Sequence, residues 1–199
     1  MLTRTWSLSA GPGCKVTVTN PTDAELAASF LAGNREAFDT IVERHRRHVY
    51  QLCYRFVGNH EDASDLAQDV FIRAYRGLRT FKGESSLGTW LYRIAVNVSL
   101  NKVGAKAPKP EPLDRLLLGQ DERAASHDED AADALLRHER AAQVRAAIAK
   151  LPKKQRATLI LRIYHELTHE QIAAILGNSV GAAKANLFHA LSNLKKLLT

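Results

Sequence analysis

The sequence predicts an all-α protein with two small helical domains joined by a flexible linker. Apolar residues recur at helical spacing through most of the chain, and strand-like text is limited to Lys15–Thr19. A proline-rich stretch at 105–112 separates the two periodic regions and favours an extended chain. We therefore expect a flexible N-terminal extension at 1–20, a first domain at 21–102, a linker at 103–132 and a second domain at 133–199.

The first domain is expected to hold four helices. The first begins in a capping box formed by Thr22 and Glu25 and ends near Gly33. The second ends at Gly58 and has one continuous stripe made of Phe38, Ile41, Val42, His45, Val49, Leu52, Cys53 and Phe56. The inner face of the third carries Ala63, Leu66, Ala67, Val70, Phe71, Ala74 and Leu78. After a loop at 80–88, the fourth carries Leu87, Leu91, Ile94, Ala95 and Val98.

The linker and the start of the second domain differ in character. The linker has an acidic cluster at 128–130 and an apolar patch at 113–118, which a solvated linker gains nothing from exposing. The next helix carries Leu135, Val144, Ile148 and Leu151. Pro152 suits the first turn of the helix after it, whose core residues are Leu159, Ile160 and Ile163.

The chain closes with a helix-turn-helix pattern. Thr168 and Gln171 form a second capping box, Gly177 suits the left-handed residue that ends a helix, and Ser179 caps the last helix. The inner face of that helix is Val180, Ala183, Leu187, Ala190, Leu191, Leu194 and Leu198. In such a unit the second helix enters the major groove of DNA, although a generic helical hairpin has the same pattern.

The positive charge is concentrated in the same part of the chain. Residues 141–199 hold nine Lys/Arg and two Asp/Glu, a balance of +7, which equals the net charge of the whole chain. Charge gathered on one small helical unit indicates an anionic polymer as partner, most simply nucleic acid. A solvated basic surface is the alternative for the charge taken alone.

Other classes of protein fit poorly. No apolar run of about 18 residues is present, so no membrane span is expected, and the first twenty residues lack the apolar core of a secretory signal. Cys53 is interpreted as a core residue and Cys14 as a free thiol, which fits a reducing cytoplasm without a metal or cofactor. Asp65 and Asp69 have no catalytic His, Ser or phosphate loop beside them, so no enzyme and no small-molecule substrate is expected.

Three ordered blocks resemble the conserved regions of sigma-70-type initiation factors. Residues 61–75 (EDASDLAQDVFIRAY) resemble the second region, and residues 81–97 resemble the region after it. Residues 151–156 (LPKKQR), together with the helix-turn-helix, resemble the fourth region. The chain has no room for the other regions of a housekeeping factor, and this compact layout is similar to the extracytoplasmic-function (ECF) subfamily.

This resemblance implies a protein that binds core RNA polymerase, recognises a promoter and helps to open it. The family's docking motif, which meets the clamp helices of the largest catalytic subunit, matches Asp62, Asp65, Leu66, Gln68, Asp69 and Phe71. Carboxylates one turn apart form a ridge that pairs with arginines of a partner. An acidic helix face is otherwise usually only solvent-facing.

Residues 81–97 are expected to hold the downstream (−10) promoter element, because unpaired bases need aromatic faces and cations. The matching residues are Phe81, Lys82, Ser85, Ser86, Trp90, Tyr92, Arg93 and Asn97. The loop at 84–87 matches the family's pocket for a flipped base. Trp90 as a plain core residue is the alternative, because Leu91 and Ile94 flank it. Residues 101–103 lack the arginines usual in relatives, which predicts a weaker grip on the single strand.

The last helix is expected to meet the upstream (−35) element. Lys153, Lys154 and Arg156 are interpreted as contacts to the DNA backbone, and Ser179, Lys184, Asn186 and His189 as the outward face of the recognition helix. Relatives commonly have a threonine and several arginines here, so we expect fewer phosphate contacts, and base specificity that rests on few groups or on DNA shape.

The resemblance also implies regulation from outside the chain. The linker matches, by position only, a segment that runs through polymerase, and an anti-sigma factor, often membrane-anchored, is the expected regulatory partner. Two other functions fit part of the sequence: a stand-alone DNA-binding regulator, which leaves residues 61–75 unexplained, and a protein that sequesters polymerase or a sigma factor and has lost DNA binding.

Overall fold

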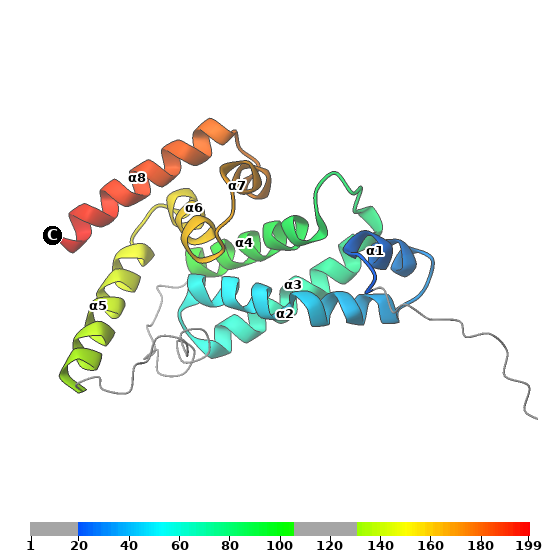
Figure 1. Cartoon of the computed structure of the whole chain (residues 1–199), viewed down its shortest axis with the longest axis horizontal. Coiled ribbons are helices and arrows are strands. Elements are labelled where there is room, and N and C mark those ends of the chain that lie inside the picture. The colour runs from blue at the N-terminus through cyan, green and yellow to red at the C-terminus, as the bar shows by residue number, and fades with distance from the viewer. Residues whose placement is uncertain (1–19, 106–130) are drawn as a thin grey trace, which may run out of the picture.

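The computed structural model describes residues 20–105 and 131–199, and every regular element in these two ranges is helical (Figure 1). The elements are α1 (Asp23–Leu31), α2 (Glu36–Val57), α3 (His60–Gly77), the 3₁₀ turn η1 (Leu78–Thr80), α4 (Leu87–Ala105), α5 (Ala131–Ala149), α6 (Lys153–Tyr164), α7 (His169–Leu176) and α8 (Val180–Leu198). The all-α fold class is confirmed. Lys15–Thr19, the expected extension up to residue 19 and the linker from 106 to 130 lie outside the described residues.

The helix ends follow the local signals in the sequence. Thr22 and Thr168 each form a complete capping box, with Glu25 and Gln171 respectively. Ser179 accepts a hydrogen bond from the backbone of Ala182 and caps α8. Two glycines, at positions 58 and 177, take the left-handed conformation with φ of 77° and 62°, and they end α2 and α7.

The first four helices and η1, hereafter the first unit, pack around α2. The apolar stripe of α2 is buried as expected, with Ile41, Leu52 and Phe56 at most 1% exposed. A polar contact fastens α1 to this bundle, because Asp23 accepts from Arg44 at 2.5 Å and lies 3.0 Å from His45 Nε2. In this bundle, α3 and α4 pack against α2 and against each other.

The last four helices, hereafter the second unit, have a small core of their own. Ile148, Leu151, Leu159 and Ala190 are buried there. Three residues predicted to lie inside are exposed instead: Ile163 by 56%, Leu191 by 50% and Leu198 by 48%. The apolar stripes of α6 and α8 are wider than the surfaces that neighbouring helices cover, so their outer edges face solvent.

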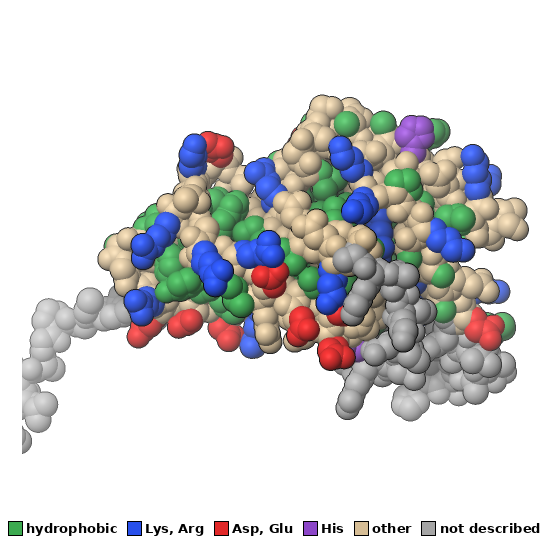
Figure 2. Space-filling model, turned by 180° about the vertical axis from the view of Figure 1, so that it is seen from behind, with side chains coloured by type: hydrophobic (Ala, Val, Ile, Leu, Met, Phe, Trp, Pro, Cys, Tyr) green, Lys and Arg blue, Asp and Glu red, His purple; other side chains and the backbone are tan. Residues whose placement is uncertain are grey.

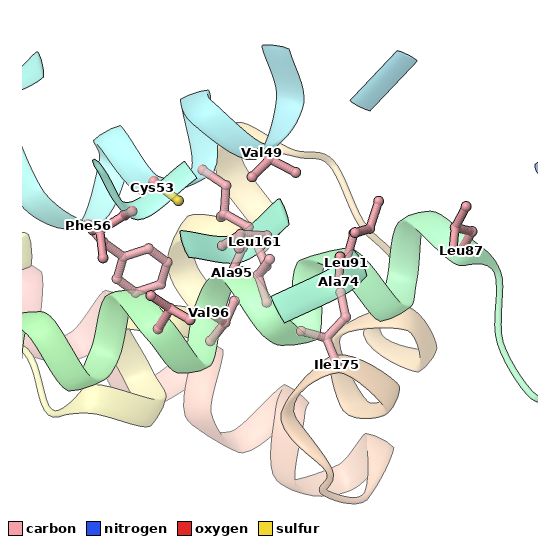
Figure 3. Packing of buried hydrophobic residues seen from close by; sticks show 14 of the residues in the cluster. Val49, Cys53, Phe56, Ala74, Leu87, Leu91, Ala95, Val96, Leu161 and Ile175 are labelled. Carbon is pink, nitrogen blue, oxygen red and sulfur yellow. The ribbon is translucent and has the colours of Figure 1, made fainter. Parts of the chain in front are cut away.

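The two units pack directly against each other, which the sequence did not indicate. Leu161 of α6 and Ile175 of α7 belong to the same buried cluster as Val49, Leu91 and Ala95 of the first unit (Figure 3). α7 packs on α4, as Figure 1 shows, and α6 contacts α2. Among the described residues, none of the helices combines the length and the apolarity that crossing a bilayer requires.

Candidate polymerase and promoter interfaces

The acidic side of α3 is held in place by a cap and by two ion pairs. Asn59 caps the helix by accepting from the backbone N–H of Asp62. The Asp62 carboxylate lies 2.8 Å from Lys102 Nζ on α4, and the hydrogen bond and attraction to Asp62 raise the pKa of Lys102. At the centre of the helix, Asp69 accepts from Arg73 at 3.0 Å through both carboxylate oxygens.

A shallow groove lies beside this acidic side, between α2 and α3. Its apolar floor and its cations come from Val42, Arg46, Arg47, Tyr50, Ser64, Ala67, Gln68, Phe71 and Ile72. Gln68 and Phe71 are the two predicted docking residues that line it, and Ile72 is 50% exposed. The cations Arg46 and Arg47 were missed by the sequence reasoning, because they sit on the outer side of an otherwise ordinary amphipathic helix.

The predicted docking residues differ in exposure. Asp65 and Gln68 are exposed, and Asp62, Asp69 and Phe71 are half-buried. Leu66 is only 5% exposed and packs in the core. Its predicted role as a direct polymerase contact does not fit this structure, since a leucine on the inner face of α3 is covered by α2 and α4.

The aromatic residues expected at the −10 element form a pair. The rings of Phe81 and Trp90 have their centroids 5.3 Å apart and are half-buried against the core. The Trp90 ring covers Gly77, where an added Cβ would lie 3.3 Å from it. Trp90 is therefore partly a packing residue, and it stays half-buried while Lys82 is exposed.

The loop before α4 serves first as a helix cap. The Ser86 hydroxyl accepts from the backbone N–H of Thr89 at 3.1 Å, which fixes the start of α4. Ser85 lies half-buried next to it, and Asn97 is exposed nearly three turns into α4. The residues predicted from 81 to 97 thus come from one continuous segment of the chain, made of the end of η1, the loop and α4.

Two of these residues contact the second unit. The Tyr92 hydroxyl lies 3.2 Å from His165 Nδ1, and the two rings meet edge to face. Burial raises the pKa of Tyr92. The guanidinium of Arg93 donates to the backbone carbonyl of Ala174 on α7 at 2.6 Å. The −10 surface predicted from the sequence is therefore partly covered by the second unit.

The predicted −35 surface lies mostly open along α8. Lys184 and His189 are exposed and Asn186 is half-buried, while the Ser179 hydroxyl is engaged in the helix cap. Phe188 is 70% exposed and meets the His189 ring edge to face, at a centroid distance of 5.7 Å. Sequence reasoning missed Phe188, although its position one turn after Lys184 on the outer face was the available signal.

The three basic residues of α6 do not form one surface. Lys153 and Lys154 are exposed, and Lys153 Nζ lies against Gly104 at the end of α4. Arg156 is only 5% exposed and donates to the backbone carbonyl of Phe56. The expectation that Arg156 is a surface contact to the DNA backbone is wrong for this arrangement, because α2 covers the guanidinium.

Charge on the surface is patterned by sign. Figure 2 shows one face on which Lys and Arg are spread widely, while Asp and Glu gather towards its lower edge.

Within the ranges that the structure describes, no group of three His, Cys, Asp or Glu residues could hold a metal ion. Burial raises the pKa of Cys53 to about 11, which keeps this core residue as an unreactive thiol.

Comparison with known proteins places both units in families. The family Sigma-70 region 2 matches residues 41–107, and the family Sigma-70, region 4 matches residues 141–194. The RNA polymerase sigma-H factor of Pseudomonas aeruginosa is 34% identical over 91% of this chain and 96% of its own length. The ECF RNA polymerase sigma factor SigW of Bacillus subtilis is 34% identical over 83% of this chain and 91% of its own.

A solved structure is also similar to this chain over most of its length. CnrH, in complex with the cytosolic domain of CnrY, is similar with a TM-score of 0.64 and 25% identity, over 88% of this chain and 96% of that one. The acidic α3, the aromatic and cationic surface of α4 and the helix-turn-helix thus occur in an order shared with sigma factors. The chain belongs to the extracytoplasmic-function subfamily of sigma-70-type RNA polymerase sigma factors, which bind core polymerase, recognise the −35 and −10 promoter elements and direct transcription initiation.

Proposed function

We propose that core polymerase docks on the outer side of α3 and on the groove beside it. Asp65 is exposed, and Asp62 and Asp69 flank it, so the ridge offers carboxylates to arginines of the clamp. Phe71 and Gln68 line the apolar groove, which supplies the buried area that charge alone does not. Leu66 supports this surface from within the core.

The −10 strand is assigned to the surface formed by η1, the following loop and α4. The paired rings of Phe81 and Trp90 offer a face on which an unpaired base can stack. Lys82, Arg93 and Asn97 are exposed on the same segment and supply phosphate and base contacts. Ser85 and Ser86 shape the loop that receives a flipped base. Tyr92 is the remaining residue assigned to this surface.

The −35 element is assigned to the outer face of α8. Lys184, Asn186 and His189 supply the polar readout, Ser179 positions the start of the helix, and Phe188 adds an apolar contact suited to a thymine methyl group. Lys153 and Lys154 contact the DNA backbone. Few cations lie on this face, so binding depends less steeply on salt than it does in an arginine-rich relative.

The chain acts as a regulated specificity subunit in the cytoplasm, makes no covalent bond itself and needs no metal or cofactor. A protein partner, an anti-sigma factor, holds it inactive. In support, the related CnrH is found in complex with the cytosolic domain of a second protein, CnrY. The domain boundaries remain a proposal, with a linker at 103–132; α4 continues to Ala105 and α5 begins at Ala131, so both helices extend into that range.

The observation that carries the assignment is the 34% identity to sigma factors over 91% of the chain, with both units included. In vitro transcription with core polymerase on genomic fragments tests it: we expect initiation from defined start sites only when the protein is added. A stand-alone regulator would bind duplex DNA and give no starts, and a sequestering protein would bind polymerase and give none. Either of those results would overturn the proposal.

A further inference from the structure

The acidic ridge of α3 is not a row of bare carboxylates, because two cations of the same chain pair with it. Lys102 of α4 lies 2.8 Å from one carboxylate oxygen of Asp62, and Asn59 donates to the other at 2.9 Å. Further along the helix, Arg73 Nε lies 3.0 Å from both carboxylate oxygens of Asp69. Two of the three carboxylates assigned to polymerase docking therefore already have cationic partners within the chain.

Both ion pairs lie at the surface. The hydrogen bond and attraction to Asp62 raise the pKa of Lys102, and the charge of Asp65 raises it further. The side chains of Lys102 and Asp62 are 34% and 31% exposed, and those of Arg73 and Asp69 are 56% and 41% exposed. Exposed pairs of this kind are weak, so a charged group of a partner protein can replace one member.

Arginine is the side chain best suited to make this exchange. A guanidinium offers two parallel N–H groups to one carboxylate, whereas the Lys102 ammonium makes a single contact with Asp62. A carboxylate has about four lone-pair sites, so Asn59 remains bonded to Asp62 and keeps it oriented while the cation is exchanged. An incoming lysine would offer no more than Lys102 already gives. The paired ridge therefore favours a partner that presents arginine.

We propose that Lys102 and Arg73 are built-in competitors of the polymerase arginines, which lower the affinity for core polymerase and make the ridge selective for arginine. They act by occupying Asp62 and Asp69, and not as contacts to polymerase. This inference rests on the proposed docking of polymerase on α3. Because the same two cations also repel arginines that approach the ridge, they act mainly by slowing association.

Removing each competitor tests the proposal in the full chain. Lys102→Met and Arg73→Met keep most of the side-chain length, and each should bind core polymerase about two- to five-fold more tightly, the range expected for an exposed ion pair. The gain should lie mainly in the association rate and shrink as salt is raised. Surface plasmon resonance on immobilised core polymerase measures both rates. The matched control, Arg35→Met with Lys150→Met, removes an exposed arginine and an exposed lysine outside α3 and α4 and should leave the affinity unchanged.

A conservative variant separates competition from support of the fold. Lys102→Arg gives Asp62 a stronger partner within the chain, so the affinity for core polymerase should fall about two-fold below that of the parent. A purely structural cation would be replaced by arginine without loss. Melting temperatures show that each variant is folded.

Unchanged or weaker binding by both methionine variants, with the fold retained, would overturn the inference. The charge reversal Asp65→Arg with Asp69→Arg, measured beside them, tells two failures apart. If the reversal abolishes binding while the methionine variants bind as the parent does, the docking surface is right and the competition is wrong. If the reversal leaves binding intact, the docking assignment fails and this inference fails with it.

Discussion

The guanidinium of Arg156, near the start of α6, donates to the backbone carbonyl of Phe56 in the last turn of α2, one hundred residues earlier. That carbonyl has no partner within its own helix, because α2 ends at Val57. A cation at the C-terminal end of a helix also meets the negative end of its dipole. Burial lowers the pKa of Arg156, and the helix end compensates part of that cost.

Arg156→Met should destabilise the protein by about 1–3 kcal/mol, because it leaves the buried Phe56 carbonyl without a donor. Methionine keeps most of the length of the side chain, so the loss reports the hydrogen bond more than the packing. Urea unfolding followed by circular dichroism measures it. Lys154→Met, on the exposed side of the same helix turn, should change stability by less than about 0.5 kcal/mol. Equal effects of the two variants would contradict the assignment.

His165 should make stability depend on pH. Burial, with the nearby charges of His48 and Arg55, lowers its pKa to about 4, below the value of about 6.5 expected in an unfolded chain. The unfolded chain therefore gains a proton between these two values that the folded chain does not take up. Stability from this group is complete above about pH 6.5 and falls by roughly 1–2 kcal/mol between about pH 7 and pH 5.

Urea midpoints across that range, compared between the parent and His165→Gln, isolate this contribution. The variant has no ring to protonate at that position, so its stability should fall less steeply with decreasing pH. The other seven histidines are common to both proteins and cancel in the difference. Parallel curves for the two proteins would show that His165 does not set the slope.

Local signals in the sequence predicted the ends of the helices well. The two capping boxes and the glycines at 58 and 177 act through backbone bonds within a few residues, and neighbouring sequence determines such bonds. The apolar stripes also predicted most of the core. Leu161 and Ile175 lie between the units, yet an apolar residue at helical spacing shows only that it is buried, and not which helix covers it.

Residue type alone predicted the exposure of several site residues wrongly, because their exposure depends on how the helices pack. A charged side chain in a basic segment is expected to be exposed, but Arg156 is buried and donates to the Phe56 carbonyl at the end of α2. Leu66, matched to a docking motif, is covered within its own unit. Conversely, an aromatic residue is expected in the core, but Phe188 is exposed because its place on α8 faces away from α5 and α6. Each of these outcomes depends on contacts distant in sequence.

Reversing charge on the ridge of α3 should abolish polymerase docking. Asp65→Arg with Asp69→Arg replaces two carboxylates one turn apart by cations, which repel the arginines that the ridge is proposed to pair with. We expect loss of binding to core polymerase, measured by fluorescence anisotropy, with helicity and melting temperature retained. Glu36→Arg with Asp39→Arg makes the same change on exposed residues of α2 and should leave binding intact. Parent-like affinity in the first variant would disprove the assignment.

Lys184→Ala should weaken recognition of the −35 element through loss of a single cation on the outer face of α8. If Lys184 reads a base, affinity for the cognate upstream element falls by about 1–3 kcal/mol and falls much less for unrelated duplexes. If it contacts only phosphate, binding weakens on every sequence and the salt slope drops by about one. Titrations of the full chain with core polymerase at several salt concentrations separate these results. Lys196→Ala removes an equally exposed lysine from the far end of the same helix, and an equal loss there would show that α8 contributes only general charge.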